Sequence, residues 1–189
     1  MSNVVQSGKK WDFYVFFDHF ILDFIYRLSQ VENSYLIMFR GIHKVTVDSK
    51  GRFAVPTKIR DLLNREQVFD LVLTLNPWDR ALWVYPLLEW ERIEGVLTSL
   101  SDFDKQTRRT KQIMRGYASD CNLDPQGRIL LPQEIRTLIC LGKESVLLGQ
   151  GNKLEIWDST VWKEERDSWL DSVENADPLK SNGLDSLSL

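Results

Sequence analysis

The sequence predicts an α+β fold, mainly β, in which two copies of a ββαββ unit share one core around a pseudo-two-fold axis. The first observation is an internal repeat, because residues 45–63 and 121–139 align without gaps at an offset of 76, with seven of nineteen positions identical. The second is the similarity of residues 82–90 to 154–162, which follows in the same order. The third is size, since a unit of about 45 residues is close to the limit for folding alone.

The first half of each copy predicts a strand and a turn. Val45 and Val47 alternate with polar residues, which is typical of a half-buried strand. Residues 124–127 (Asp-Pro-Gln-Gly) then have the signature of a type I β-turn. Residues 48–51 (Asp-Ser-Lys-Gly) keep the first and last members of that signature. We therefore expect the same tight turn in both copies.

A second strand and a short helix follow each turn. The strands are expected at 52–55 and 128–131, and Pro56 and Pro132 suit the first position of a helix. Gly142 is the expected end of the second helix. Apolar residues spaced i, i+3 and i+4 give each helix one buried stripe: Ile59, Leu62 and Leu63, and Ile135, Leu138 and Ile139.

The remaining elements are two further strands per copy and the helices that follow them. These strands are expected at 71–75, 81–85, 145–149 and 153–157, with turns at 76–79 and 149–152. Residues 87–115 predict helix with an apolar face, and Ser101-Asp102 is the expected cap of its second segment. A similar helix is expected from Ser159 onward. The tryptophans of the repeats (Trp78, Trp83, Trp90, Trp157 and Trp162) are expected to be core or interface anchors.

This pattern divides the chain into five parts. The predicted boundaries are a leader at 1–37, a first unit at 42–89, a helical connector at 90–117, a second unit at 118–161, and a C-terminal helix with a disordered tail at 162–189. The aromatic-rich leader is best interpreted as a start codon assigned too early, with Met38 opening the repeat. The alternative is an amphipathic helix that contacts a membrane or a partner. A membrane span is not expected, because Asp12, Asp18 and Asp23 interrupt the apolar run.

The charge of the chain is acidic in total but unevenly distributed. The formal net charge is −3 and the pI is near 5.5, which excludes a polycation that coats nucleic acid. Residues 44–65 contain six cations against two acids, and residues 105–115 contain five cations and no acid. From residue 155 to the end, three cations stand against nine acids. A local basic surface is therefore expected on the first copy.

Catalysis and cofactors are not expected. Two cysteines and two histidines are too few for a disulfide framework or a histidine-based metal site. The sequence contains no glycine-rich phosphate loop. Asp48 and Asp124 resemble a catalytic carboxylate pair, but each lies at a turn with an arginine four residues later, so the repeat explains them without chemistry.

The basic turn of each copy is the candidate DNA-binding site. A two-stranded ribbon fits the major groove of DNA, and Arg52 is the first candidate for reading bases, with Arg128 as its equivalent. Lys50, Lys58 and Arg60 suit phosphate contacts, which fix register. A structural interpretation stays open for several residues. In it, Asp48 and Asp124 bridge to these arginines or cap the turns, and Gly51 and Gly127 form the turns. For Arg60 and Arg136 the alternatives are a phosphate contact and an inter-subunit ion pair. The cationic segment 105–115 is interpreted as a solvated helix face, with a DNA contact as the alternative.

The repeated Asp-x-x-Gly-Arg turn, followed by a strand, a proline and a short helix, resembles the AbrB-like swapped-hairpin DNA-binding domain. Two copies joined by helices, opening with Met-Phe-Arg-Gly at residues 38–41, are similar to the bacterial MraZ family. The resemblance covers about residues 38–170. The doubled Asp-x-x-x-Arg motif, Asp48 with Arg52 and Asp124 with Arg128, is the family's recognised motif.

This resemblance implies a barrel-like core of swapped hairpins and a transcriptional regulator, usually a repressor. It implies binding of double-stranded DNA at tandem repeats in the promoter of the division and cell-wall gene cluster that includes the regulator's own gene. It also implies a homo-oligomeric ring in the cytoplasm, associated with the nucleoid. Two alternatives remain open: an oligomeric scaffold that binds a protein partner, and an antitoxin-like DNA-binding protein.

Overall fold

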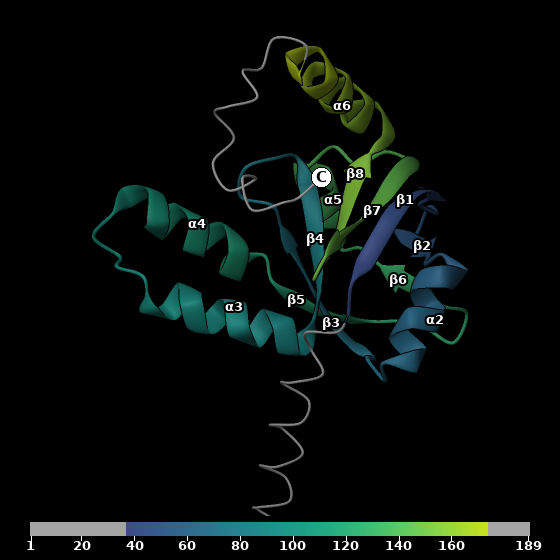
Figure 1. Cartoon of the computed structure of the whole chain (residues 1–189), viewed down its shortest axis with the longest axis horizontal. Coiled ribbons are helices and arrows are strands. Elements are labelled where there is room, and N and C mark those ends of the chain that lie inside the picture. The colour runs from purple at the N-terminus through teal and green to yellow at the C-terminus, as the bar shows by residue number, and fades with distance from the viewer. Residues whose placement is uncertain (1–36, 174–189) are drawn as a thin grey trace, which may run out of the picture.

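The structure, a computed structural model, describes residues 37–173 and contains the two predicted ββαββ units (Figure 1). The first unit consists of β1 (Phe39–Thr46), β2 (Arg52–Ala54), α2 (Thr57–Arg65), β3 (Asp70–Leu75) and β4 (Ala81–Pro86). Helices α3 (Leu87–Ser99) and α4 (Lys105–Gly116) follow. The second unit consists of β5 (Ser119–Asn122), β6 (Arg128–Leu130), α5 (Gln133–Leu138), β7 (Glu144–Gly151) and β8 (Leu154–Asp158), and α6 (Ser159–Val173) comes last. The α+β, mainly β class is therefore confirmed.

The two copies exchange strands. An antiparallel six-stranded sheet has the order β1-β7-β8-β4-β3-β5, and a separate two-stranded ribbon pairs β2 with β6. The first strand of each copy thus pairs with a strand of the other copy and not with its own second strand. Val45 lies opposite Ser145, and its repeat equivalent Cys121 lies opposite Leu71. This order and register are those that a pseudo-two-fold axis between β4 and β8 produces.

The shared core lies between the six-stranded sheet and the β2–β6 ribbon. Phe53 and Ile129, which pair across the ribbon and are equivalent in the repeat, are 1% and 0% exposed. They pack with buried sheet residues such as Leu82 and Ile156, and with the buried residues of both helix stripes: Ile59, Leu63, Ile135 and Ile139. Burial of these apolar surfaces is the main favourable term that holds the two copies together.

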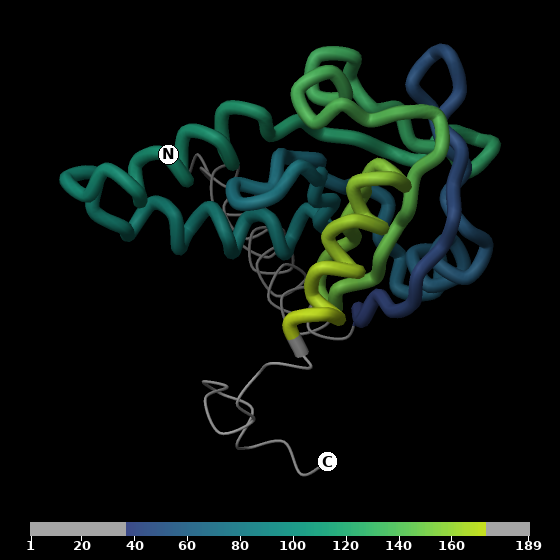
Figure 2. The backbone as a smooth tube through the Cα atoms, turned by 90° about the horizontal axis from the view of Figure 1, so that it is seen from above, coloured from purple at the N-terminus to yellow at the C-terminus, as the bar shows by residue number. Residues whose placement is uncertain are grey.

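The other face of the sheet is covered by helices. Helices α3 and α4 cover β3 and β4 through a cluster that includes Trp83, Trp90 and Met114, while α6 covers β7 and β8 around Trp157. Seen from above, α3 and α4 form a two-helix hairpin whose far end extends away from the sheet (Figure 2). Trp78 departs from the expected anchoring, because it is 68% exposed on the β3–β4 turn.

Several helix ends differ from the sequence prediction. Pro56 and Pro132 are the N-cap residues of α2 and α5, one position before the first helical turn. Helix α5 ends before Gly142, because Cys140 adopts the left-handed conformation (φ 55°) and reverses the chain there. Asp104, and not Ser101-Asp102, caps α4 through a hydrogen bond from the Thr107 N–H at 2.6 Å.

The predicted domain boundaries stay a prediction. Helices α3 and α6 begin at Leu87 and Ser159, where the sequence predicted these helices to begin. Both positions lie three residues before the predicted domain boundaries at 90 and 162. The leader before Ile37 and the tail beyond Val173 lie outside the described residues, so the interpretations of both segments stay expectations. Within residues 37–173, no helix has the length and apolar character needed to cross a membrane.

Candidate nucleic-acid interface

Both Asp-x-x-Gly-Arg turns have the same hydrogen-bonded geometry. Asp48 accepts hydrogen bonds at Oδ1 from the backbone N–H groups of Lys50 (2.9 Å) and Arg52 (2.8 Å), and at Oδ2 from the Arg52 Nε–H (2.9 Å). Asp124 accepts the equivalent bonds from Gln126 (2.9 Å), from Arg128 N (2.9 Å) and from Arg128 Nε (2.7 Å). Each aspartate therefore both closes its turn and fixes the direction of its arginine.

The turn glycines bring the two copies into contact. Gly51 and Gly127 have φ of 84° and 73°, a conformation that favours glycine. The Gly51 carbonyl accepts a hydrogen bond from the Leu131 N–H at 2.8 Å, and the Gly127 carbonyl accepts one from the Val55 N–H at 2.9 Å. Each turn is thus held by the strand end of the other copy as well as by its own aspartate.

The helix arginines lie against these glycines. A β-carbon on Gly51 would lie 2.7 Å from Arg136 Nε, and one on Gly127 would lie 2.5 Å from Arg60 Cδ. Arg136 donates from Nε to the Leu131 carbonyl at 3.1 Å, and Arg60 donates from NH2 to Thr57 Oγ1 at 3.1 Å. Each helix arginine therefore packs on the turn of the other copy, a placement that the repeat alone did not indicate.

The β2–β6 ribbon brings both motif arginines to one surface. Arg52 lies opposite Leu130, and Ala54 lies opposite Arg128. Because neighbouring strand residues point to opposite faces and Phe53 points into the core, these four side chains share the outward face. The two turns, which are 76 positions apart in the sequence, thus contribute their arginines to one strip of surface.

The other candidate residues lie around this strip. Lys50 is exposed at the tip of the first turn, where the second copy has the neutral Gln126, and Lys58 is exposed at the start of α2. The sequence analysis missed Leu130, which is 56% exposed beside Arg52. The two-residue period of a strand was the signal, because it places Leu130 on the same face as Arg128, and Ile129 and Leu131 on the other face.

Electrostatics keep both turn aspartates ionised. Hydrogen bonding by the backbone N–H of Arg52, and then by its side chain and by Lys50, lowers the pKa of Asp48 below the ordinary 3.8. For Asp124 the side-chain hydrogen bond of Arg128 is the largest cause, followed by the backbone N–H groups of Arg128 and Gln126. The Asp48–Arg52 and Asp124–Arg128 ion pairs, at 2.8 and 2.7 Å, act in the same direction.

This difference between the two turns predicts different responses to the loss of each arginine. We expect Arg128→Ala to raise the pKa of Asp124 more than Arg52→Ala raises the pKa of Asp48. Alanine keeps the backbone N–H, which is the largest cause at Asp48, but removes the side-chain hydrogen bond, which is the largest cause at Asp124. An aspartate whose pKa is lower in the folded than in the unfolded chain stabilises the fold at any pH above the unfolded pKa of 3.8. This stabilisation is lost as the pH falls from 3.8 through the pKa of the folded state. Carboxyl-carbon NMR titration of the wild type and both variants measures these pKa values. If the pKa of Asp48 and the pKa of Asp124 rose equally in the two variants, the arginine side chain would not be the larger cause at Asp124 alone, and this explanation would be wrong.

Two observations on the described residues concern metal binding and thiol chemistry. Among residues 37–173, no group of three or more His, Cys, Asp or Glu side chains is arranged to hold a metal ion. Burial, and then the charge of Asp120, raises the pKa of the Cys121 thiol to about 12, which leaves it protonated and unreactive at neutral pH.

The fold and this surface define a class: a tandem duplication of one turn-bearing ββαββ domain, in which the copies exchange strands and present both arginine turns on a shared ribbon. A family model described as "MraZ protein, putative antitoxin-like" matches the chain twice, at residues 38–113 and 114–176. The chain therefore belongs to the MraZ family, as its doubled motif indicated.

Named relatives match over their whole length. The transcriptional regulator MraZ of Thioalkalivibrio sulfidiphilus is 46% identical over 153 residues, which cover 80% of this chain and 100% of the relative. The proteins of the same name from Marinomonas sp. and Halorhodospira halophila are 41% and 40% identical over 152 residues, again 80% of this chain and 100% of each relative. These relatives bear the name of a transcriptional regulator and not of an enzyme, which places this chain among regulators of transcription.

Proposed function

We propose that the chain binds double-stranded DNA sequence-specifically and that the outward face of the β2–β6 ribbon is its reading surface. The observation that carries the proposal is the position of Arg52 and Arg128 on one face of a two-stranded ribbon. The major groove of B-DNA is wide enough for such a ribbon, and arginine is the commonest specific reader of guanine.

The geometry of each turn supports base reading by its arginine. Asp48 Oδ2 engages Nε and NH2 of Arg52, at 2.9 and 2.8 Å, which leaves NH1 and the outer N–H of NH2 for a bidentate contact. A guanidinium held in place by a carboxylate loses less conformational freedom on binding, which improves affinity. Lys50, Lys58 and Arg60 then supply phosphate contacts on the more basic first copy.

We further infer that the exchanged strands belong to a swapped-hairpin, barrel-like core of the AbrB type. The pairing of β1 with β7, of β5 with β3 and of β2 with β6 supports this arrangement, since each copy completes the other. Such a core makes the ribbon rigid, and a rigid ribbon holds Arg52 and Arg128 at a fixed spacing.

The resemblance to the family supports a proposal for the assembly of the regulator and for its target promoter. We propose a repressor that assembles as a homo-oligomeric ring and binds tandem repeats in the promoter of the division and cell-wall gene cluster, including its own gene, at the nucleoid. One ribbon gives a small footprint and weak affinity. Several ribbons in one assembly raise the affinity for tandem repeats through effective concentration, without any new contact.

Binding to the DNA upstream of this gene tests the proposal. We expect fluorescence anisotropy to detect tight binding to a fragment with two or more repeats, and weaker binding to one repeat. Log K should fall linearly with log salt concentration, with a slope of about −0.9 per neutralised phosphate. Equal affinity for the upstream fragment and for random DNA of the same length would overturn sequence-specific binding. Full affinity for a single repeat would overturn the requirement for tandem sites.

A further inference from the structure

The outward face of the β2–β6 ribbon contains a large apolar side chain beside its arginines. Leu130 is 56% exposed, whereas its neighbours Ile129 and Leu131 are both 0% exposed in the core. The other side chains on the outward face are those of Arg52, Ala54 and Arg128. A single exposed leucine is common on protein surfaces, so the meaning of this one depends on what surrounds it.

Leu130 lies directly beside Arg52. Next to this pair along the ribbon, the Leu131 N–H donates a hydrogen bond to the Gly51 carbonyl at 2.8 Å. Because hydrogen-bonded and non-hydrogen-bonded pairs alternate in an antiparallel ladder, Arg52 and Leu130 form a non-hydrogen-bonded pair. The side chains of such a pair lie closer together than those of a hydrogen-bonded pair. In a major groove, Leu130 therefore reaches the base pairs next to the one that Arg52 contacts.

The two copies differ at this position. The repeat offset of 76 relates the two motif arginines to each other, and it relates Leu130 to Ala54. Ala54 is also exposed, but its side chain is a single methyl group and extends less far from the ribbon. The tips of the turns differ too, with Lys50 in the first and Gln126 in the second. The arginines by themselves are arranged to read a two-fold symmetric sequence, whereas the complete face is asymmetric.

The methyl group of thymine is the DNA group that fits Leu130. In the major groove, base edges present hydrogen-bond donors and acceptors, and thymine adds its C5-methyl group. A leucine side chain cannot pair with donors, acceptors or phosphates, and covering them removes their water at a cost. It gains free energy only by burying apolar surface. The chemistry of Leu130 therefore points to a thymine.

We propose that Leu130 is a specificity-determining residue that packs on the C5-methyl of a thymine beside the guanine contacted by Arg52. Ala54 makes no equivalent contact at the other end of the ribbon. Each repeat is therefore bound in one orientation, with the thymine at the Arg52 end. This inference rests on the proposed DNA-binding function and names part of the sequence that the ribbon reads.

Replacement of thymine by deoxyuridine tests the contact, because it removes the C5-methyl and leaves every hydrogen-bonding group in place. The probe is a single-repeat duplex from the DNA upstream of this gene, in which each thymine of either strand is replaced in turn. Anisotropy with excess random DNA measures the affinity. We expect one replacement to weaken wild-type binding about fourfold, the effect of burying one methyl group. Leu130→Ala should bind the unmodified repeat more weakly and should bind both forms of the duplex equally.

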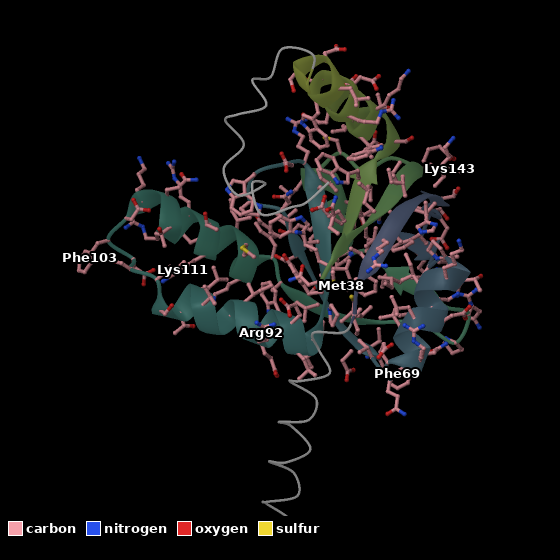
Figure 3. The ribbon with its side chains drawn as sticks, viewed as in Figure 1. Met38, Phe69, Arg92, Phe103, Lys111 and Lys143 are labelled. Atoms are coloured by element: carbon pink, nitrogen blue, oxygen red, sulfur yellow. The ribbon has the colours of Figure 1, made fainter. Side chains whose placement is uncertain are left out.

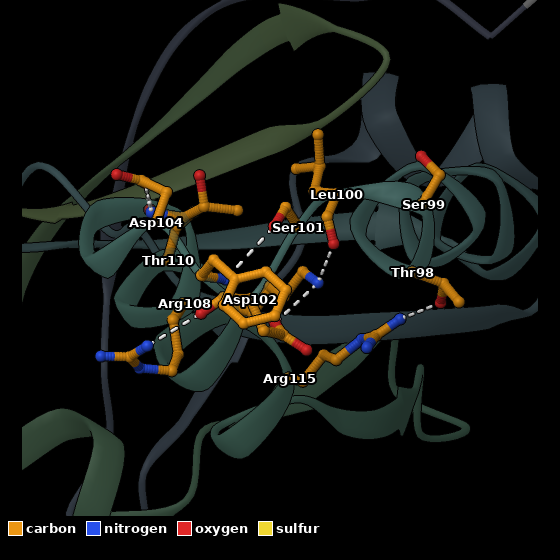
Figure 4. Close-up of polar contacts among 12 residues, drawn as sticks. Thr98, Ser99, Leu100, Ser101, Asp102, Asp104, Arg108, Thr110 and Arg115 are labelled. Carbon is orange, nitrogen blue, oxygen red and sulfur yellow. Dashed lines mark hydrogen bonds and ion pairs between the residues drawn. The ribbon is translucent and has the colours of Figure 1, made fainter.

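Leu100→Ala is the matched control. Leu100 is 43% exposed at the far end of the α3–α4 hairpin, where Phe103 projects away from the rest of the molecule (Figure 3). The Leu100 carbonyl accepts a hydrogen bond from Lys111 Nζ at 2.5 Å, and Lys111 also binds Asp102 Oδ1 at 2.8 Å (Figure 4). Alanine keeps that carbonyl, so the hairpin end should keep its conformation. This variant should retain the wild-type preference for the thymine methyl.

Ala54→Leu tests the asymmetry by a gain of specificity. The substitution places a second leucine opposite Arg128 at an exposed position, so it displaces no core atom. The variant should gain a preference of about fourfold for a thymine introduced at the position symmetric to the sensitive one. The wild type should be indifferent to that thymine, and a wild-type preference there would overturn the single orientation.

The remaining outcomes separate this inference from the proposed function. If the wild type binds the repeat more tightly than random DNA but no thymine methyl matters, the Leu130 contact is wrong and the proposed function stands. The same holds if Leu130→Ala loses as much affinity on methyl removal as the wild type does. If the wild type binds the repeat no more tightly than random DNA, both proposals are overturned.

Discussion

An Arg52→Ala variant is expected to bind its operator about 10–100-fold more weakly than the wild type, which corresponds to about 1–3 kcal/mol for one bidentate arginine contact. The turn should survive the change, because Asp48 still accepts hydrogen bonds from the backbone N–H groups of residues 50 and 52. The loss should therefore be a loss of base contact. In an assembly that engages several repeats, the loss recurs at each repeat and the total effect is larger.

Controls separate base reading from simple loss of charge. Arg80→Ala removes the same charge from an exposed position on the β3–β4 turn, outside the motif, and should leave the ratio of specific to random DNA affinity unchanged. Arg52→Lys keeps the charge but not the bidentate geometry, so it should restore affinity for random DNA more than specificity. Equal effects of Arg52→Ala and Arg80→Ala would mean that Arg52 contributes only charge. Arg128→Ala, tested in parallel, measures how far the second copy shares the reading.

Gly149→Ala is expected to destabilise the fold by about 3 kcal/mol and to lower Tm by about 10 °C. Gly149 lies opposite Gly41 where β7 pairs with β1 of the other copy. A β-carbon there would lie 2.2 Å from the Arg40 backbone N and 2.5 Å from the Phe39 backbone carbon. Backbone atoms in a hydrogen-bonded ladder cannot move aside as a flexible side chain does, so the two strands must separate locally. Thermal unfolding followed by circular dichroism measures the effect.

The matched control is the same substitution at Gly95. This glycine lies in α3, and a β-carbon there would meet nothing within 4 Å. Gly95→Ala should therefore stabilise the protein by about 0.5–1 kcal/mol through the higher helix propensity of alanine. If Gly149→Ala were as well tolerated as Gly95→Ala, the close approach of β1 and β7 would be wrong, and with it the exchange of strands at that edge.

The local elements were predictable because their causes are local. Strand alternation, the turn signature of residues 124–127 and the position of Pro56 each depend on a few consecutive residues, and all correspond to elements of the structure. The helix ends were predicted less well. Gly142 was chosen as the end of α5, whereas Cys140 takes the left-handed position. Asp104, and not Ser101-Asp102, caps α4. Several residues near each helix end have side chains or backbone conformations that can cap or end a helix. Which of them does so depends on tertiary packing.

The sequence identified the individual candidate residues of the DNA-binding site, but it did not show how they lie together on one surface. The motif identified Arg52 and Arg128 as equivalent candidates, and the aspartate bridge to each arginine, left open from the sequence, is present in the structure. The contact of Arg60 and Arg136 with the opposite turns was not predictable, because it depends on how the two copies are placed. The DNA-contact roles of Arg52, Lys50, Arg128, Arg60 and Lys58 stay predictions that the experiments above address.

By itself, the sequence determined that this protein contains one ββαββ unit twice, with an Asp-x-x-Gly-Arg turn in each copy, and that it resembles a family of transcriptional regulators. Those properties follow from periodicity, turn chemistry and self-similarity, which act over short stretches of chain. Only the tertiary structure decided which strands pair. The hydrogen-bonding groups of a strand can pair with any exposed edge, and the choice depends on burying Phe53 and Ile129 together between the two copies. That choice places Arg52 and Arg128 on a single ribbon.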